Sequence, residues 1–238
     1  SKYNNHFVYS INPFILTDLD DKLLKIGYSY ATAFIAPTLY QSYGSLPYVL
    51  PNFDLKPETN ASHELDFSFG KKDRTFVVNA SVFSRKEKDV FVYNWDNRKF
   101  LNVESNKVKG VELGVQYHFN EKVNVGGNFS FAEKDNPATR LRSPKQRANA
   151  FLEILPIKNN RINISYQYTS KRYDSSSFST KNVELEAFHL FNLNINQKIT
   201  KSLDTYLNVG NVLNTSYTDV IGYTTKPRNI TLGVEYKF

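Results

Sequence analysis

The chain has 238 residues, no cysteine, no methionine and a formal net charge of +7 at pH 7. The lack of cysteine excludes a disulfide framework, a thiol nucleophile and a thiolate metal site. Lys and Arg are spread among Asp and Glu through the expected turns and loops, so no single patch predicts a nucleic-acid partner. The missing methionine and the lack of a secretory signal at 1–11 indicate a processed product or a fragment.

Apolar and polar residues alternate through most of the chain, which is the period of a strand with one apolar face. Near the end, Ile230, Leu232 and Val234 share one such face. In chain order, the pattern predicts strands at 7–16, 23–34, 62–69, 76–93, a strand ending at 111–119, then strands at 123–131, 148–155, 162–171, 185–197, 203–213 and 229–238. It predicts no helix, and no apolar run approaches the roughly 18–20 residues of a membrane-spanning helix.

The connections between these strands mostly alternate in length. Short turns are expected at 18–21, 70–73, 120–121, 156–160 and 199–201, and long loops at 35–60, 133–143, 172–182 and 215–228. The turn at 95–98 is short where a long loop is due. Most predicted strands have about 10–16 residues, against the usual 5–6 of globular sheets. This combination favours an all-β fold of the outer-membrane barrel type over a soluble β-sandwich, the alternative at the level of fold.

The number of strands and the lengths of their connections predict how the chain is oriented in the membrane. If the short turns are periplasmic, Ser1 begins outside the cell and Phe238 lies at the periplasmic rim. The eleven predicted strands are an odd number, whereas bacterial barrels made of one chain have an even number. The sequence therefore predicts that N-terminal strands of the barrel lie outside this chain.

Several motifs resemble the barrel of TonB-dependent outer-membrane receptors, in the same order. They are FIAPTLYQSYG at 34–44, NFDLKPE at 52–58, VKGVEL at 108–113, LNVGNVLN at 207–214 followed by Tyr217, and RNITLGVEYKF at 228–238. Within the family, ISYQYTSKRYD at 164–174 and VIGYTTKPR at 220–228 are most similar to cobalamin receptors. Siderophore and haem receptors share some of these motifs.

The resemblance implies a 22-stranded transmembrane antiparallel barrel around an N-terminal plug, in which residues 1–238 are the C-terminal part. The N-terminal strands, the plug domain and the TonB box lie outside this chain. The implied function is substrate-specific import of a scarce nutrient, and cobalamin or another corrinoid is the expected substrate. The implied partners are TonB through the missing N-terminal part, the rest of the barrel and plug, outer-membrane lipid and lipopolysaccharide, and a surface lipoprotein.

Ligand-binding candidates are the aromatic residues of long loops and turns, together with a basic run at 140–147. Rings with a few polar neighbours suit large planar or amphipathic ligands, and arginines suit anionic groups. The candidates are Tyr40, Tyr43, Trp95, Arg140, Arg142, Tyr173 and Tyr223. The alternatives are loop packing and lipopolysaccharide contact for the rings, and a solvated loop or lipid phosphates for the arginines.

Enzyme chemistry is not expected. Glu64 and Asp66 share a face, but a polar lumen needs charges in any case. The four His do not lie two residues apart on a strand, and there is no phosphate loop or G-x-S-x-G motif. No catalytic residue, metal ligand or cofactor is therefore assigned. The rival functions are a siderophore or haem receptor, a passive porin or adhesin barrel, and an outer-membrane hydrolase.

Overall fold

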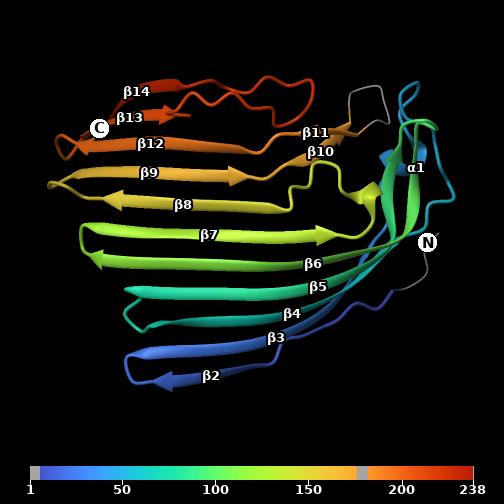
Figure 1. The fold of residues 1–238 in the computed structure, drawn as a ribbon, viewed down its shortest axis with the longest axis horizontal. Coiled ribbons are helices and arrows are strands. Elements are labelled where there is room, and N and C mark those ends of the chain that lie inside the picture. Colours follow the sequence, from blue (N-terminus) through green and yellow to red (C-terminus); the bar gives the residue numbers. More distant parts are fainter. Residues whose placement is uncertain (1–5, 176–181, 238) are drawn as a thin grey trace.

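The computed structural model describes residues 6–175 and 182–237, which form mostly antiparallel strands (Figure 1). The strands are β1 (Ser10–Ile11), β2 (Phe14–Leu19), β3 (Lys22–Ile35), β4 (Glu58–Lys71), β5 (Phe76–Asn94), β6 (Lys99–Asn120), β7 (Val123–Lys134), β8 (Gln146–Ile154), β9 (Asn160–Thr169), β10 (Arg172–Ser175), β11 (Asn182–Leu185), β12 (Phe188–Lys198), β13 (Leu203–Gly210) and β14 (Asn229–Tyr236). Two short helices join them, α1 (Leu39–Tyr43) and the 3₁₀ helix η1 (Pro137–Thr139). The all-β prediction is confirmed.

One sheet contains every strand except β10 and β11. Its order is β1-β3-β4-β5-β6-β7-β8-β9-β12-β13-β14, and β2 also pairs with β3. Because β1 and β2 share one neighbour, they occupy one position at the edge, and the sheet has the eleven positions that the alternation predicts. Sequence neighbours pair throughout except at β9 and β12, between which the hairpin β10–β11 is inserted. The predicted ends Ser1 and Phe238 lie outside the described residues.

The two ends of the sheet differ, as predicted. The turns that join β2–β3, β4–β5, β6–β7, β8–β9 and β12–β13 gather at one end, and the figure shows α1, β10 and β11 at the other (Figure 1). We call these the short-turn end and the long-loop end. The turn at 95–98 lies at the long-loop end. The strands on either side of it, β5 and β6, are 19 and 22 residues long. The strands themselves extend the hairpin there, which explains why its turn is short.

The prediction of no helix was wrong at α1 and at η1, both of which are short. Thr38 Oγ1 accepts a hydrogen bond from the backbone N–H of Gln41 at 3.2 Å, and the Gln41 side chain accepts from the Thr38 N–H at 2.8 Å. This reciprocal cap satisfies two donors at the start of α1. A five-residue helix is too short to show a period of 3.6, so hydrophobic patterning could not reveal it.

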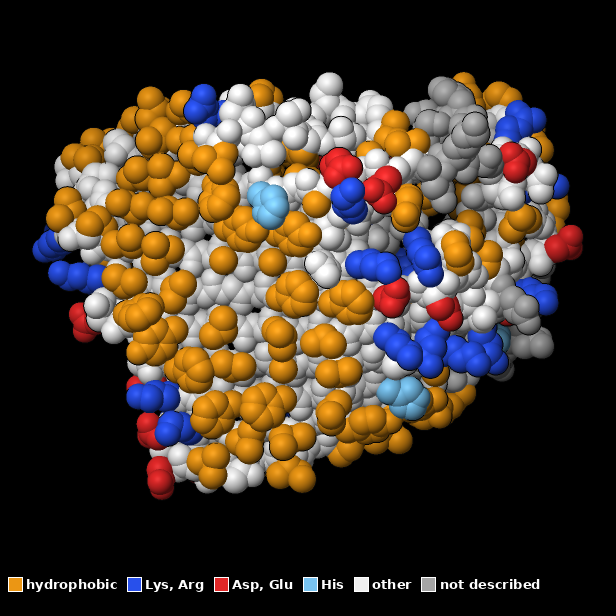
Figure 2. Space-filling model, viewed as in Figure 1, with side chains coloured by type: hydrophobic (Ala, Val, Ile, Leu, Met, Phe, Trp, Pro, Cys, Tyr) orange, Lys and Arg blue, Asp and Glu red, His pale blue; other side chains and the backbone are white. Residues whose placement is uncertain are grey.

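The register gives the sheet two chemically different faces. One cross-strand row carries Ile26, Phe67, Ala80, Leu113 and Phe129, and the adjacent row carries Gly27, Asp66, Ser81, Glu112 and Ser130 on the opposite side. We call these the apolar face and the polar face. Hydrophobic side chains cover the strands over most of the face seen in Figure 2. Leu65 and Val82 on this face are each 55 % exposed, so no described part of this chain covers the apolar face at these positions.

The few hydrophobic residues that are buried lie at the long-loop end. They are Val49, Leu55, Val108, Leu185 and Phe188. A sheet that buries so little apolar surface needs a non-aqueous neighbour over its apolar face. Over 6–175 and 182–237, no helix is long and apolar enough to cross a membrane.

Candidate functional site

The predicted ligand-binding residues all lie at the long-loop end, but in separate groups. Tyr40 and Tyr43 are on α1, and Trp95 is in the turn between β5 and β6. Arg142 and Tyr173 meet where the connection after η1 contacts β10. Arg140 and Tyr223 belong to neither group.

Edge-to-face contacts between aromatic rings connect α1 to the β5–β6 hairpin. The ring of Tyr40 meets Phe100 edge-on at a centroid distance of 5.9 Å, and Phe100 meets Tyr93 at 5.3 Å. Trp95 lies perpendicular to Tyr93 at 4.9 Å. Tyr43, which is 63 % exposed, contacts Phe53 at 5.2 Å. The structure thus brings Tyr40 and Trp95 together through Tyr93 and Phe100, which the alternation had assigned only to strands or their ends.

Backbone contacts hold the long loop 36–57 against the same hairpin. The side chain of Asn102 donates to the Lys56 carbonyl at 2.9 Å and accepts from the Lys56 N–H at 2.9 Å. The Asn52 side chain donates to the Phe100 carbonyl at 2.7 Å, and the Leu50 N–H donates to the Arg98 carbonyl at 2.7 Å. The loop that carries Tyr40 and Tyr43 is therefore fixed in place without a ligand.

A buried carboxylate organises the second group. Asp174 is fully buried and accepts hydrogen bonds from Arg142 Nε at 2.8 Å, from the Ser175 N–H at 2.8 Å and from the Ile221 N–H at 2.9 Å. Burial acts to raise the pKa of the Asp174 carboxyl, but these donors outweigh it and hold the pKa below its ordinary value. The Arg142 N–H also donates to the Tyr173 carbonyl at 2.7 Å. One ionised side chain therefore joins three segments of the chain.

Arg172 ties the loop 215–228 to the same hairpin. Its side chain is only 2 % exposed, and its Nη2 donates to the carbonyls of Thr218 and Asp219 at 2.8 and 2.9 Å and to Asp219 Oδ1 at 2.9 Å. The guanidinium lies over the ring of Phe188 at 5.2 Å. Its other terminal nitrogen, Nη1, is buried without a hydrogen-bond partner among the described residues.

Three arginines line one cavity of about 300 Å³ on the polar face. We call it the arginine pocket; its lining residues are Arg142, Pro144, Arg147, Asn149, Gln167, Tyr168, Thr169, Arg172, Asp219 and Val220. Arg142 is bound through Nε only, and Arg147 forms no ion pair within 4 Å in the described part of the chain. The pocket therefore carries positive charge suited to an anionic group. The sequence analysis did not single out Arg172, which stood at the start of an expected loop and within the motif 164–174.

Two predicted residues lie apart from these groups. Arg140 donates from Nε to the Lys134 carbonyl at 2.8 Å and from Nη2 to the Asp135 carbonyl at 2.9 Å, so it closes the end of β7. Tyr223 is 76 % exposed, and only its backbone N–H is held, by the Val220 carbonyl. Neither lines the arginine pocket.

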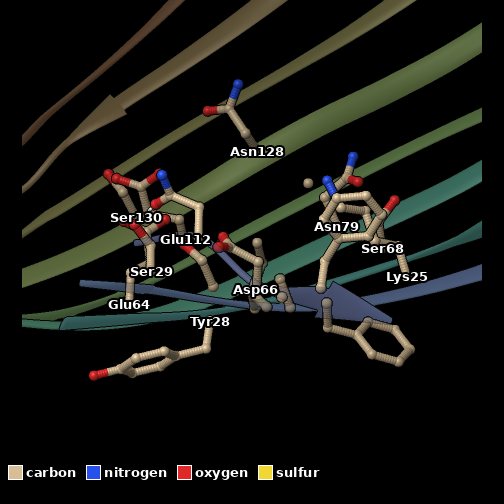
Figure 3. A pocket seen from close by; sticks show the side chains of 18 of the residues that line it. Lys25, Tyr28, Ser29, Glu64, Asp66, Ser68, Asn79, Glu112, Asn128 and Ser130 are labelled. Carbon is tan, nitrogen blue, oxygen red and sulfur yellow. Dashed lines mark hydrogen bonds between the residues drawn. The ribbon is translucent and has the colours of Figure 1, made fainter. Parts of the chain in front are cut away.

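Two wider cavities cover the polar face between the ends of the sheet. The larger, of about 870 Å³, is lined by carboxylates of Glu64, Asp66 and Glu112, which point to the polar side in Figure 3 while Tyr28 points away. The second, of about 670 Å³, is rich in amides. Its amide side chains are Asn79, Gln116, Asn128, Asn149, Gln167 and Asn192. Nowhere in 6–175 and 182–237 do three His, Asp or Glu side chains converge as metal ligands.

Comparison with known sequences identifies relatives. The family described as "TonB dependent receptor-like, beta-barrel" matches residues 2–212. The vitamin B12 transporter BtuB of Vibrio cholerae serotype O1 is 27 % identical over 217 residues, which cover 88 % of this chain and 34 % of the transporter. This chain therefore spans about a third of the length of the curated relatives that it matches.

Solved structures share the architecture. The siderophore receptor PirA from Acinetobacter baumannii superposes with a TM-score of 0.78 at 17 % identity, covering 100 % of this chain and 42 % of that one. PirA from Pseudomonas aeruginosa gives 0.77 at 17 % identity, with coverage of 100 % and 41 %. The copper transporter OprC gives 0.75 at 15 % identity, with coverage of 97 % and 40 %. At such identities the likeness shows the fold alone.

The fold and the family match agree. An antiparallel sheet with an uncovered apolar face, short turns at one end and long loops at the other is typical of an outer-membrane barrel wall. The matched family consists of transport receptors, not enzymes, and its barrels are integral to the bacterial outer membrane. This chain belongs to the family of TonB-dependent receptor β-barrels.

Proposed function

We propose that this chain is part of an import receptor that binds cobalamin or another corrinoid at the long-loop end. The whole receptor is proposed to contain further N-terminal strands, a plug and a TonB-contacting segment, and to draw energy for uptake through TonB. Residues 1–238 supply the C-terminal part of its barrel wall and outer loops. A surface lipoprotein is a further proposed partner over those loops.

One contact carries the proposal. The two segments that most resemble cobalamin receptors, 164–174 and 220–228, meet through the hydrogen bond from the Ile221 N–H to Asp174 Oδ2 at 2.9 Å. The first segment also supplies Gln167 and Arg172 to the arginine pocket, and the second supplies Val220. The two segments that resemble cobalamin receptors are therefore adjacent in the structure. The relative from Vibrio cholerae, named as a vitamin B12 transporter, supports the same substrate.

The chemistry of the polar face suits a corrinoid. A corrinoid is a large ring system with many peripheral amides and, in cobalamin, one phosphodiester. Amide side chains line the 670 Å³ cavity, and amides pair with amides through both a donor and an acceptor. The arginine pocket, a short way along the same face through Asn149 and Gln167, suits the phosphodiester.

A receptor for a ferric siderophore or haem is the second candidate. The observation that favours it is the arginine pocket, since carboxylate-bearing or catecholate iron chelates are anionic and suit three arginines. The two candidates differ in what the amide-lined cavity contributes. It contributes most of the polar contacts to a corrinoid and few to a small charged chelate.

Calorimetry on the full-length receptor in detergent tests the proposal. Cyanocobalamin, a ferric siderophore and haem are titrated separately. We expect saturable binding of cyanocobalamin alone. Binding of a siderophore or haem without cyanocobalamin would replace the corrinoid by the second candidate, and binding of none would favour a passive barrel.

A further inference from the structure

The apolar face ends abruptly on β5 and β6. Val82 lies opposite Val111, and both are part of the apolar rows. The next three pairs toward the long-loop end on the same face are Ser84–Lys109, Lys86–Lys107 and Lys88–Ser105. We call these six residues the lysine patch. Four of six adjacent positions are therefore lysine and the other two are serine.

Burial shows which way these side chains point. Lys86, Lys88, Lys107 and Lys109 are all exposed, whereas the residues between them, including Glu87, Asn106 and Val108, are buried. Because successive residues of a strand face opposite sides, the lysines lie on the outward side that carries the apolar face. Figure 2 shows Lys and Arg side chains gathered there, with some Asp and Glu side chains between them, beyond the hydrophobic side chains toward the long-loop end.

The lysine patch has few charge partners among the described side chains. Lys86 lies directly opposite Lys107, and like charges at such positions destabilise a sheet. In the described part of the chain, none of the four lysines has a carboxylate oxygen within 4 Å of its ammonium nitrogen. Glu87 is on the other side of the sheet, where it binds Arg85 at 2.6 Å and Asn106 at 2.5 Å.

Two acids near the lysine patch are engaged by other groups. Glu133, in register with Lys109, accepts a hydrogen bond from Lys145 Nζ at 2.5 Å. Asp135 accepts from the backbone N–H of Lys107 at 2.6 Å. The repulsion among these lysines is only partly offset by acids of the described chain. It therefore favours an anionic partner outside the protein.

Neighbouring residues give the depth of the lysine patch in the membrane. His63 is in register with Ser84, and its Nδ1 lies 2.8 Å from the hydroxyl of Tyr28. The same arrangement recurs on the same face further along the sheet, where Tyr166 of β9 and His189 of β12 are hydrogen-bonded at 2.8 Å. Tyrosines with one polar end mark the level at which lipid tails give way to headgroups. The lysine patch begins at this level, on the side of the long outer loops.

We propose that the lysine patch binds the phosphate groups of an outer-leaflet lipid, the lipid A portion of lipopolysaccharide. Ammonium groups donate charge-assisted hydrogen bonds to phosphate oxygens, and the hydroxyls of Ser84 and Ser105 add neutral donors. The lipid chains then cover the apolar rows at Val82 and Val111 directly below. This site is on the outside of the barrel and is independent of the nutrient that the receptor carries.

Lipid binding to the full-length receptor in detergent tests this site. The probes are bisphosphorylated lipid A, the same lipid after removal of its phosphates, and inorganic phosphate, with bound lipid counted by native mass spectrometry. The variant is Lys86→Gln with Lys107→Gln. The matched control is Lys158→Gln with Lys201→Gln, which removes two exposed lysines from turns at the short-turn end.

We expect the Lys86/Lys107 variant to bind bisphosphorylated lipid A about tenfold or more weakly, since each basic residue near a membrane surface contributes roughly a factor of five. The control variant should bind like the unaltered receptor, and the dephosphorylated lipid should not distinguish the three proteins. Equal binding by both variants would overturn the proposal. Displacement of lipid A by millimolar inorganic phosphate would also overturn it, because the lysine patch would then bind free phosphate and not a lipid. If the first variant does not fold, Lys88→Gln with Lys109→Gln replaces it.

Discussion

Arg142 Nε donates to Asp174 Oδ1 over 2.8 Å, so the connection after η1 and the hairpin β10–β11 share one buried carboxylate. The two residues are 32 positions apart, and each belongs to a different outer loop. The same carboxylate accepts from Ile221 in a third loop. The shape of the arginine pocket therefore depends on the charge state of a residue that a ligand does not need to touch.

Asp174→Asn should loosen the three loops without unfolding the sheet. The amide has one acceptor in place of two carboxylate oxygens, and its NH₂ group faces a donor that was previously satisfied. We expect a local loss of about 1.5–3 kcal/mol, the range for hydrogen bonds to a charged group. Hydrogen exchange at 215–228 measures it. Asp96→Asn, in the exposed turn after β5, is the matched control and should leave exchange unchanged.

The same contact gives a pH dependence with a definite sign. The pKa of Asp174 is lower in the folded loops than in the unfolded chain, so the unfolded state binds more protons and loop stability rises with pH. The contribution should be complete above the unfolded pKa of about 4 and should be lost as the pH falls through the lower folded value. Exchange at 215–228 measured from pH 7 to pH 3 checks this, with Asp174→Asn as a reference that lacks the transition.

Arg147→Gln should weaken binding of the nutrient and leave the fold intact. The guanidinium lines the arginine pocket and holds no ion pair in the part of the chain that the structure describes. Loss of one charge-assisted hydrogen bond corresponds to roughly a tenfold rise in Kd. Calorimetry with the ligand that saturates the full-length receptor measures the change. Lys145→Gln removes the same charge two residues away, where Lys145 binds Glu133, and should leave Kd unaltered.

Two glycines of β6 provide a matched pair for packing on the polar face. A Cβ at Gly110 would lie 2.5 Å from the Phe131 carbonyl oxygen and collide with the ring of Phe83, whereas a Cβ at Gly114 meets nothing within 4 Å. Gly110→Ala should cost about 1–3 kcal/mol through overpacking. Gly114→Ala should be neutral or slightly stabilising. Heat-induced loss of the folded band on gels compares the two, and equal midpoints would contradict the expectation.

The sequence predicts the sheet well because a period of two is local. Alternation around Leu65 and Phe67 identifies a strand without knowledge of its partners, and the same holds for the other strand positions. Residues 172–182 were expected to be a loop, but 172–175 and 182–185 pair as β10–β11, and 176–181 lie outside the described residues. Four-residue strands are too short for a visible alternation.

The sites were harder to predict because they depend on register. Arg142, Arg147 and Arg172 reach one pocket only after β8 and β9 are paired, and nothing in the local sequence marks Arg172 as different from its neighbours. Charge along the chain showed no single patch, yet pairing places Lys86 opposite Lys107. Averages over a sequence window cannot detect charges that are 21 residues apart and adjacent in space.

The order of the sheet has a consequence for how such a wall is built. Consecutive strands from β3 to β9 pair with one another, so every strand pairing in this stretch joins chain segments that are synthesised in succession. Closing short loops costs little entropy, and folding can proceed one hairpin at a time. In this stretch the strand formed last is the edge strand with which the next strand in sequence pairs. Each strand is therefore the pairing template for the one that follows it.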